Sequence, residues 1–153
     1  FVEVYAFDGS NWTETGDINT ARGIAPFFGT QTASILASGQ TDTASVANVE
    51  EFNGTSWTEI AEVNTVRQEH AAAGSVSTDA IIFAGSPTKA NTEAWNGTAW
   101  TEVNDLGTAR YALGGSGTGA LGLASLGTTG GSGRLASTEE WTLAHPIKTV
   151  TTS

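Results

Sequence analysis

The chain of 153 residues contains no cysteine and no methionine, and only six of its residues are lysine or arginine. Without cysteine it can form no disulfide, has no thiol nucleophile and offers no thiolate to a metal. The sixteen acidic residues bring the net charge to −10. Because binding to phosphates or to an anionic bilayer needs a basic surface, we expect neither nucleic acid nor a membrane as a partner.

Long hydrophobic runs are missing as well. The longest candidate, residues 80–84, is far shorter than the roughly 20 residues that cross a bilayer. The first residues also lack the basic region and apolar segment of a secretory signal. Since the chain starts at Phe1 rather than at methionine, we expect it to be part of something longer.

What the chain does have is an internal repeat. Residues 7–14 (FDGSNWTE) return as residues 52–59 (FNGTSWTE) and 95–102 (WNGTAWTE), and a fourth, partial copy begins at Thr138. The steps are 45, 43 and 46 residues, and a fixed period of this length is typical of a repeat architecture. The recurring residues are expected to be structural: Gly9, Gly54 and Gly97; Trp12, Trp57 and Trp100; Arg22, Arg67 and Arg110.

Each copy divides into four segments of strand length, separated by turn residues. In the middle of the chain they are Gln68–Gly74, Asp79–Gly85, Thr92–Trp95 and Ala99–Val103. The Asn-Gly pairs between the last two segments predict tight hairpins, with the flanking aromatic residues paired across the strands. The segments change from small to aliphatic to aromatic along each copy. That order suits a sheet whose first strand is crowded at a central axis, so the predicted fold class is an all-β propeller of four-stranded antiparallel blades.

At this point the residues resemble kelch repeats. The basic residue Arg67, the small pair Ala84-Gly85, the Glu93-Ala94-Trp95 segment and Trp100 stand where a kelch blade has its landmarks. The sequence of residues 93–110 is similar to the repeats of kelch-like structural and fibre proteins in the virions of marine tailed phages, of the cyanophage type. The sequence departs from the kelch pattern at the glycine doublet, which here reads Ser-Gly, Ala-Gly or Leu-Gly.

The whole chain, residues 1–153, is expected to be one kelch-like propeller region. Residues 1–21 would supply the outer strands of a partial blade, and residues 22–63, 67–106 and 110–150 would form successive blades, with a last strand around Ile147–Val150. About three and a half blades are fewer than the four to eight of most propellers. We therefore expect either a longer propeller or a ring closed by several copies.

The three in-register arginines have two possible roles. They could line an axis and hold an anionic sugar, or each could pair with a glutamate of its own repeat, such as Glu50 or Glu93, and stack on a tryptophan. Strict repetition favours the structural role.

No catalytic residue, metal or cofactor is expected. Glu14, Glu59 and Glu102 fall in different repeats, too far apart for the paired carboxylates of a glycosidase. The only histidines, His70 and His145, are out of register and too few for a zinc site.

The connections between the second and third segments differ most between copies. They comprise residues 40–48, 86–91 and 128–137, and such loops on a rigid scaffold are where binding residues concentrate. The polar residues that break the repeat there are the predicted ligand-binding residues: Asp42, Thr43, Lys89 and Arg134.

These observations predict a non-enzymatic virion protein, a tail fibre, spike or decoration, exposed on the virion surface or outside the cell. Its expected partners are other virion proteins or copies of itself, and a host cell-surface glycan. One alternative is a purely structural assembly protein that never contacts the host. Another is a secreted bacterial carbohydrate-binding or glycan-active propeller, whose pocket would combine Tyr5 or Tyr111 with glutamate and arginine of different blades.

Overall fold

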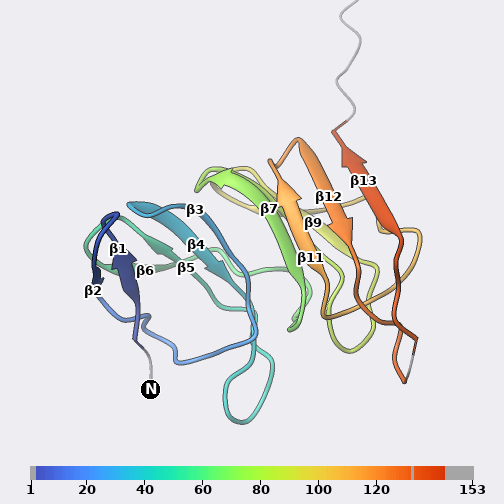
Figure 1. The fold of residues 1–153 in the computed structure, drawn as a ribbon, viewed down its shortest axis with the longest axis horizontal. Helices are drawn as coiled ribbons and strands as arrows, with labels where there is room; N and C mark the ends of the chain where they lie inside the picture. The colour runs from blue at the N-terminus through green and yellow to red at the C-terminus, as the bar shows by residue number, and fades with distance from the viewer. Residues whose placement is uncertain (1–2, 132, 144–153) are drawn as a thin grey trace, which may run out of the picture.

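The regular secondary structure of the described residues is all β-strand, as predicted. The computed structural model describes residues 3–131 and 133–143, in which thirteen strands form four antiparallel sheets and no helix occurs. No described segment is a helix long and apolar enough to cross a membrane. In Figure 1 the sheets follow one another in chain order across the molecule.

The sheets have two, four, four and three described strands. The first contains β1 (Tyr5–Phe7) and β2 (Trp12–Glu14). The second contains β3 (Phe27–Thr30), β4 (Ala33–Ala37), β5 (Val49–Phe52) and β6 (Trp57–Ile60). The third contains β7 (Ala71–Val76), β8 (Asp79–Phe83), β9 (Thr92–Trp95) and β10 (Trp100–Val103). The fourth contains β11 (Gly114–Gly117), β12 (Leu121–Ser125) and β13 (Thr138–Thr142).

The predicted hairpins are present in each complete repeat. Asn53 Oδ1 accepts hydrogen bonds from the N–H groups of Thr55 and Ser56, and Gly54 has a φ of 94°, which the turn requires. Across the hairpin, the rings of Phe52 and Trp57 lie 5.1 Å apart. The same arrangement recurs in the third sheet, so the turn interpretation of the Asn-Gly pairs is confirmed.

Adjacent sheets pack through their first strands and bury apolar side chains between their faces. β3 contacts β7, and β7 contacts β11. We call the contact between the second and third sheets the middle joint. It buries Phe28, Ile35 and Ala37 of the second sheet against Ile82, Trp95 and Trp100 of the third. Each sheet is therefore stabilised by its neighbours as well as by its own ladder.

One expected strand is displaced. The segment predicted at Gln68–Gly74 is β7, which begins at Ala71 and runs to Val76. Glu69 has a φ of 53°, incompatible with a strand, and its N–H donates to the carbonyl of Ile24 in the preceding repeat. The chain therefore turns before it can enter the ladder. The expected last strand around Ile147–Val150 lies outside the described residues.

The position before the repeat glycine carries backbone strain. Ser38, Ala84 and Leu126 have φ values of 57°, 65° and 65°, in the left-handed region that side chains disfavour. Leu126 is 60% exposed, so its side chain contributes little burial in return.

Replacing Leu126 by glycine is expected to stabilise the fold. Relief of about 1–2 kcal/mol of left-handed strain outweighs the roughly 0.5–1 kcal/mol entropic cost of glycine in the unfolded chain. We expect urea unfolding to give a gain of about 0.5–1 kcal/mol for Leu126→Gly. The matched control Leu126→Ala keeps the β carbon and the strain, so an equal gain from both variants would contradict this explanation.

Candidate functional site

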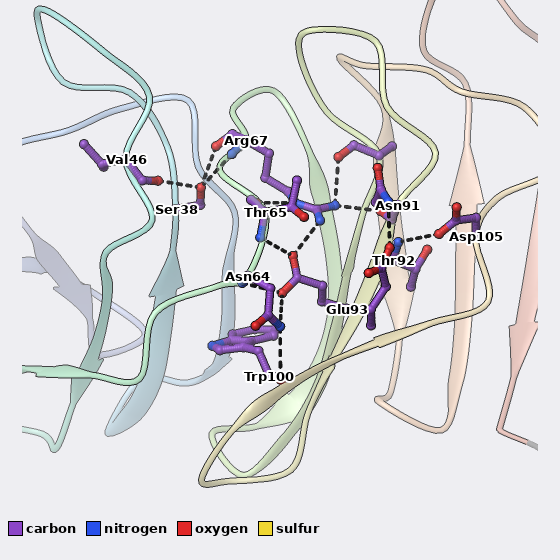
Figure 2. A network of polar contacts seen from close by, with 12 residues as sticks. Ser38, Val46, Asn64, Thr65, Arg67, Asn91, Thr92, Glu93, Trp100 and Asp105 are labelled. Atoms are coloured by element: carbon purple, nitrogen blue, oxygen red, sulfur yellow. Dashed lines mark hydrogen bonds and ion pairs between the residues drawn. The ribbon is translucent and has the colours of Figure 1, made fainter.

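A buried ion pair stands at the centre of each complete repeat. Arg67 Nη2 lies 2.7 Å from Glu93 Oε1, and both side chains are at most 1% exposed (Figure 2). Arg67 also donates to the carbonyl oxygens of Ala84 and Asn91. Because charge-assisted bonds in a water-free environment are strong and directional, Arg67 fixes the ends of β8 and β9.

The Glu93 carboxylate also accepts hydrogen bonds from the linker that precedes Arg67, at Asn64 and Thr65. They come from the N–H groups of Asn64 and Thr65 and from Asn64 Nδ2. Asn64 Nδ2 donates also to the carbonyl of Trp100, so the connection to tryptophan is made through an asparagine (Figure 2). The network thus joins the second, third and fourth strands of the sheet to the segment that enters it.

The arginine–glutamate pair recurs in the neighbouring sheets, with Asn19 in the place of Asn64 in one and Gly107, through its backbone N–H alone, in the other. Arg22 pairs with Glu50 at 2.5 Å, and Arg110 pairs with Glu139 at 2.5 Å. The three arginine side chains are fully buried, whereas the Glu139 side chain is 25% exposed. The structure therefore pairs each in-register arginine with a glutamate of its own repeat.

The electrostatics of these pairs follow from burial and hydrogen bonding. Burial alone would raise the pKa of Glu50, but donation from Arg22 and from the N–H groups of Asn19 and Thr20 holds that pKa below its ordinary value. Burial lowers the pKa of Arg67, and the charge of Glu93 opposes this shift. The Arg22–Glu50 and Arg67–Glu93 pairs are thus buried and satisfied by protein groups.

The variable connections all lie at one edge of the sheets. In antiparallel sheets, the links from second to third strands emerge on the same side, at the lower edge in Figure 1. Of the predicted binding residues, Asp42 and Thr43 are exposed in the first such connection. Lys89 is half-buried in the second, and its backbone pairs with that of Arg110.

Arg134 is the predicted binding residue that lies beside a cavity. Together with Thr128 and Leu135 it lines a cleft of about 610 Å³ at the end of the fourth sheet. Within residues 3–131 and 133–143, no hydrogen bond or ion pair joins the side chains of Asp42, Lys89 and Arg134. They share an edge without forming a single pocket.

Two polar residues missed by the sequence argument connect the first variable connection to the next repeat. Ser45 Oγ donates to Gln68 Oε1 at 2.9 Å, and Gln68 forms a backbone bridge with Ser86 in the second connection. Both residues depart from the repeat pattern, and this departure was the one sequence signal that could have pointed to them. They hold adjacent connections side by side.

His70, which the sequence analysis judged unsuited to a zinc site, is a third residue whose surroundings were not predicted. It is buried, whereas the equivalent positions, three residues after each repeat arginine, hold Ala25 and Leu113. Neither ring nitrogen has a hydrogen-bond partner at ordinary distance and angle, although the backbone of Ala37 lies close enough to oppose the pKa shift. Burial, reinforced by the charge of Arg67, lowers the pKa of His70 from 6.5 to about 3.

No group of three or more potential metal ligands occurs among the described residues, and His145 lies outside them. Tyr5 and Tyr111 belong to different ends of the row of sheets: Tyr5 lies on β1, whereas Tyr111 bridges to Thr128 beside the fourth sheet.

No protein-family model and no curated protein sequence matches the chain.

Proposed function

We propose that the chain is a non-enzymatic structural protein built from kelch-like propeller blades, which presents its variable connections to a glycan on a host surface. The propeller assignment is supported by sheets of one design that contact each other through their first strands. The assignment to a virion fibre, spike or decoration follows the resemblance of the repeats.

The observation that carries the proposal is the division between constant and variable residues. The constant residues, the arginine–glutamate networks, are buried and occupied with one another. The variable connections share one edge and carry exposed polar groups, as in Asp42 and Thr43. A rigid scaffold with varied loops on one edge is the arrangement that binding proteins use.

Sugar is the ligand class that these connections suit. Hydroxyl, carboxylate and cationic side chains can together donate to and accept from sugar hydroxyls. The cleft beside Arg134 provides a concave surface at the same edge. Because the repeat arginines are sealed inside the sheets, they offer no cation to a substrate carboxylate, which argues against a lyase or sialidase.

The test is binding of the chain to a panel of surface polysaccharides from candidate host cells. We expect the triple variant Asp42→Ala, Lys89→Ala and Arg134→Ala to weaken binding at least about tenfold, because each alanine removes polar contacts worth roughly 1 kcal/mol. The matched control is Ser56→Ala with Thr98→Ala, in hairpin turns at the opposite edge. Equal loss in both variants would contradict the assigned edge.

A purely structural assembly role is the second candidate. It is favoured by apolar side chains exposed at both ends of the row of sheets, such as Phe27 and Trp12 at one end and Leu121 and Leu123 at the other. This role predicts stoichiometric incorporation into particles and no binding to host cells or to their polysaccharides. The two candidates therefore separate in the same binding experiment.

A further inference from the structure

The two Asn-Gly hairpin turns differ from the buried networks of the chain in what holds the asparagine side chain. Asn53 and Asn96 are exposed, and no hydrogen bond among the described residues uses their Nδ2 atoms. Elsewhere the amide nitrogen is held by a glutamate, to which Nδ2 donates in Asn19, Asn48, Asn64 and Asn91. At the two turns the amide nitrogen is therefore free to leave.

The oxygen of the same amide is held by the turn. Asn53 Oδ1 accepts hydrogen bonds from the N–H groups of Thr55 and Ser56, both at 3.0 Å. The two corresponding N–H groups of the second turn lie 2.9 Å from Asn96 Oδ1. Paired N–H groups directed at a carbonyl oxygen stabilise the negative charge that forms there when a nucleophile attacks its carbon. The turn thus activates Cγ of each asparagine.

A nucleophile follows directly in the chain. The peptide nitrogen of Gly54 comes next after Asn53, and no hydrogen bond among the described residues uses its N–H group. Glycine has no side chain that could shield this nitrogen. Because Asn53 Oδ1 reaches forward to the N–H groups beyond Gly54, the side chain folds over the Gly54 peptide. Gly97 has the same place after Asn96.

The first repeat carries an aspartate at the equivalent place. Asp8 stands where Asn53 and Asn96 stand, and its Oδ1 accepts hydrogen bonds from the N–H groups of Ser10 and Asn11, both at 2.8 Å. The bonds from Asn11 and Ser10 lower the pKa of Asp8, so its carboxylate is charged at neutral pH. The turn therefore accepts a carboxylate in the place of the amide.

We propose that Asn53 and Asn96 deamidate spontaneously in the folded protein, and that the turn directs the product to aspartate. The peptide nitrogen of the following glycine loses its proton to base and attacks Cγ, which closes a cyclic imide. The bond between Cγ and Nδ2 breaks, and the amide nitrogen takes up a proton and leaves as ammonia. Water then opens the imide, so each conversion replaces one amide by one carboxylate.

The same pair of N–H groups decides which bond the water breaks. Attack at Cγ restores the original backbone and gives aspartate, whereas attack at the main-chain carbonyl carbon gives isoaspartate, with an extra carbon in the backbone. In the first case the charge forms on Oδ1, where the two N–H groups stabilise it. The main-chain carbonyl oxygen of Asn53 accepts no hydrogen bond among the described residues. The turn therefore favours aspartate.

This modification goes beyond the proposed function, because it is a chemical change of the chain that needs no partner. The two turns lie at the edge opposite the variable connections, so glycan binding and deamidation can succeed or fail independently. Each conversion adds one negative charge to a chain whose net charge is already −10.

The test is incubation of the folded chain in mildly alkaline water enriched in heavy oxygen, followed by isoelectric focusing and peptide mass spectrometry. We expect singly and then doubly converted acidic species, with heavy oxygen at residues 53 and 96. The comparison is a peptide of residues 50–59, which is too short to keep a hairpin on its own. The ratio of aspartate to isoaspartate should be about tenfold higher in the folded chain, the effect of one ordinary hydrogen bond on one barrier.

The chain supplies matched controls. Asn11 and Asn104 are exposed as well, but the residue after each has a side chain that shields its peptide nitrogen, so neither should change. The variant Asn53→Ser keeps an acceptor oxygen at the turn and should remove the doubly converted species, while Asn96 still converts. A folded chain that does not convert would overturn the proposal. So would equal product ratios in chain and peptide, or conversion at Asn11 as fast as at Asn53.

Discussion

Replacing Glu93 by alanine lowers the free energy of unfolding by about 3–5 kcal/mol, the range expected when one partner of a buried pair is removed. The loss is large because the Arg67 side chain is fully buried and cannot turn to water. The N–H groups of Asn64 and Thr65 lose their acceptor as well. Urea unfolding at pH 7 measures the change.

The chain offers a matched control for this prediction. Glu139 makes the same pair with Arg110, but its side chain is 25% exposed, so water can replace part of what alanine removes. We expect a loss of roughly 2 kcal/mol for Glu139→Ala, the scale of a charged hydrogen bond. An equal loss at both positions would mean that burial does not set the cost.

Glu50 and Glu93 could be named from the sequence as possible partners of the repeat arginines because the signal repeats, whereas Glu139, the partner of Arg110, was not named. An arginine at one fixed place in three copies, with a glutamate at another, points to a contact that every copy needs. The hairpins at Asn53 and Asn96 were predictable for a local reason, since Asn-Gly by itself favours the backbone that the turn requires. Both predictions depend on residues that are close in the sequence or repeated in it.

The displaced start of β7 could not be predicted in this way. The positive φ of Glu69 accompanies hydrogen bonds between repeats: its N–H donates to Ile24, and its carbonyl accepts from Ala112 N–H. Nothing in the local sequence favours a left-handed glutamate. The hydrogen bond between Ser45 and Gln68 likewise depends on how adjacent sheets are placed relative to each other. The sequence therefore predicted which loops vary, but not how these loops lie against one another in the fold.

We expect His70 to make the stability of the fold sensitive to mild acid. Its pKa is about 3 in the folded protein against an ordinary value of 6.5. Below pH 6.5, His70 therefore binds a proton in the unfolded chain but not in the folded chain. Stability is therefore complete above pH 6.5 and falls as the pH drops toward 3. The loss is about 1.4 kcal/mol per pH unit, or roughly 2 kcal/mol between pH 7 and pH 5.

Replacing His70 by leucine should remove this dependence and stabilise the protein at pH 7. Leu113 stands at the equivalent position of the next repeat, so the repeat accepts leucine there. Removing two unpaired buried ring nitrogens gains about 1–2 kcal/mol. Urea unfolding of both proteins from pH 5 to pH 8 measures the gain and the slope together. Below pH 5, carboxylates such as Glu50, whose pKa is held low by Arg22, add their own loss in both proteins.

A third variant, His70→Gln, separates the two causes. Glutamine does not titrate but keeps a buried polar group, so it should lose the slope between pH 5 and pH 7 without the gain at pH 7. If the slope persists in both variants, another group titrates and His70 is not the source. If leucine removes the slope but brings no gain, the ring nitrogens are satisfied in solution. The neighbouring repeats carry Ala25 and Leu113 at the equivalent position, so the fold does not need a histidine there. The variants therefore separate the effect of the charge of His70 from the effect of burying its polar ring.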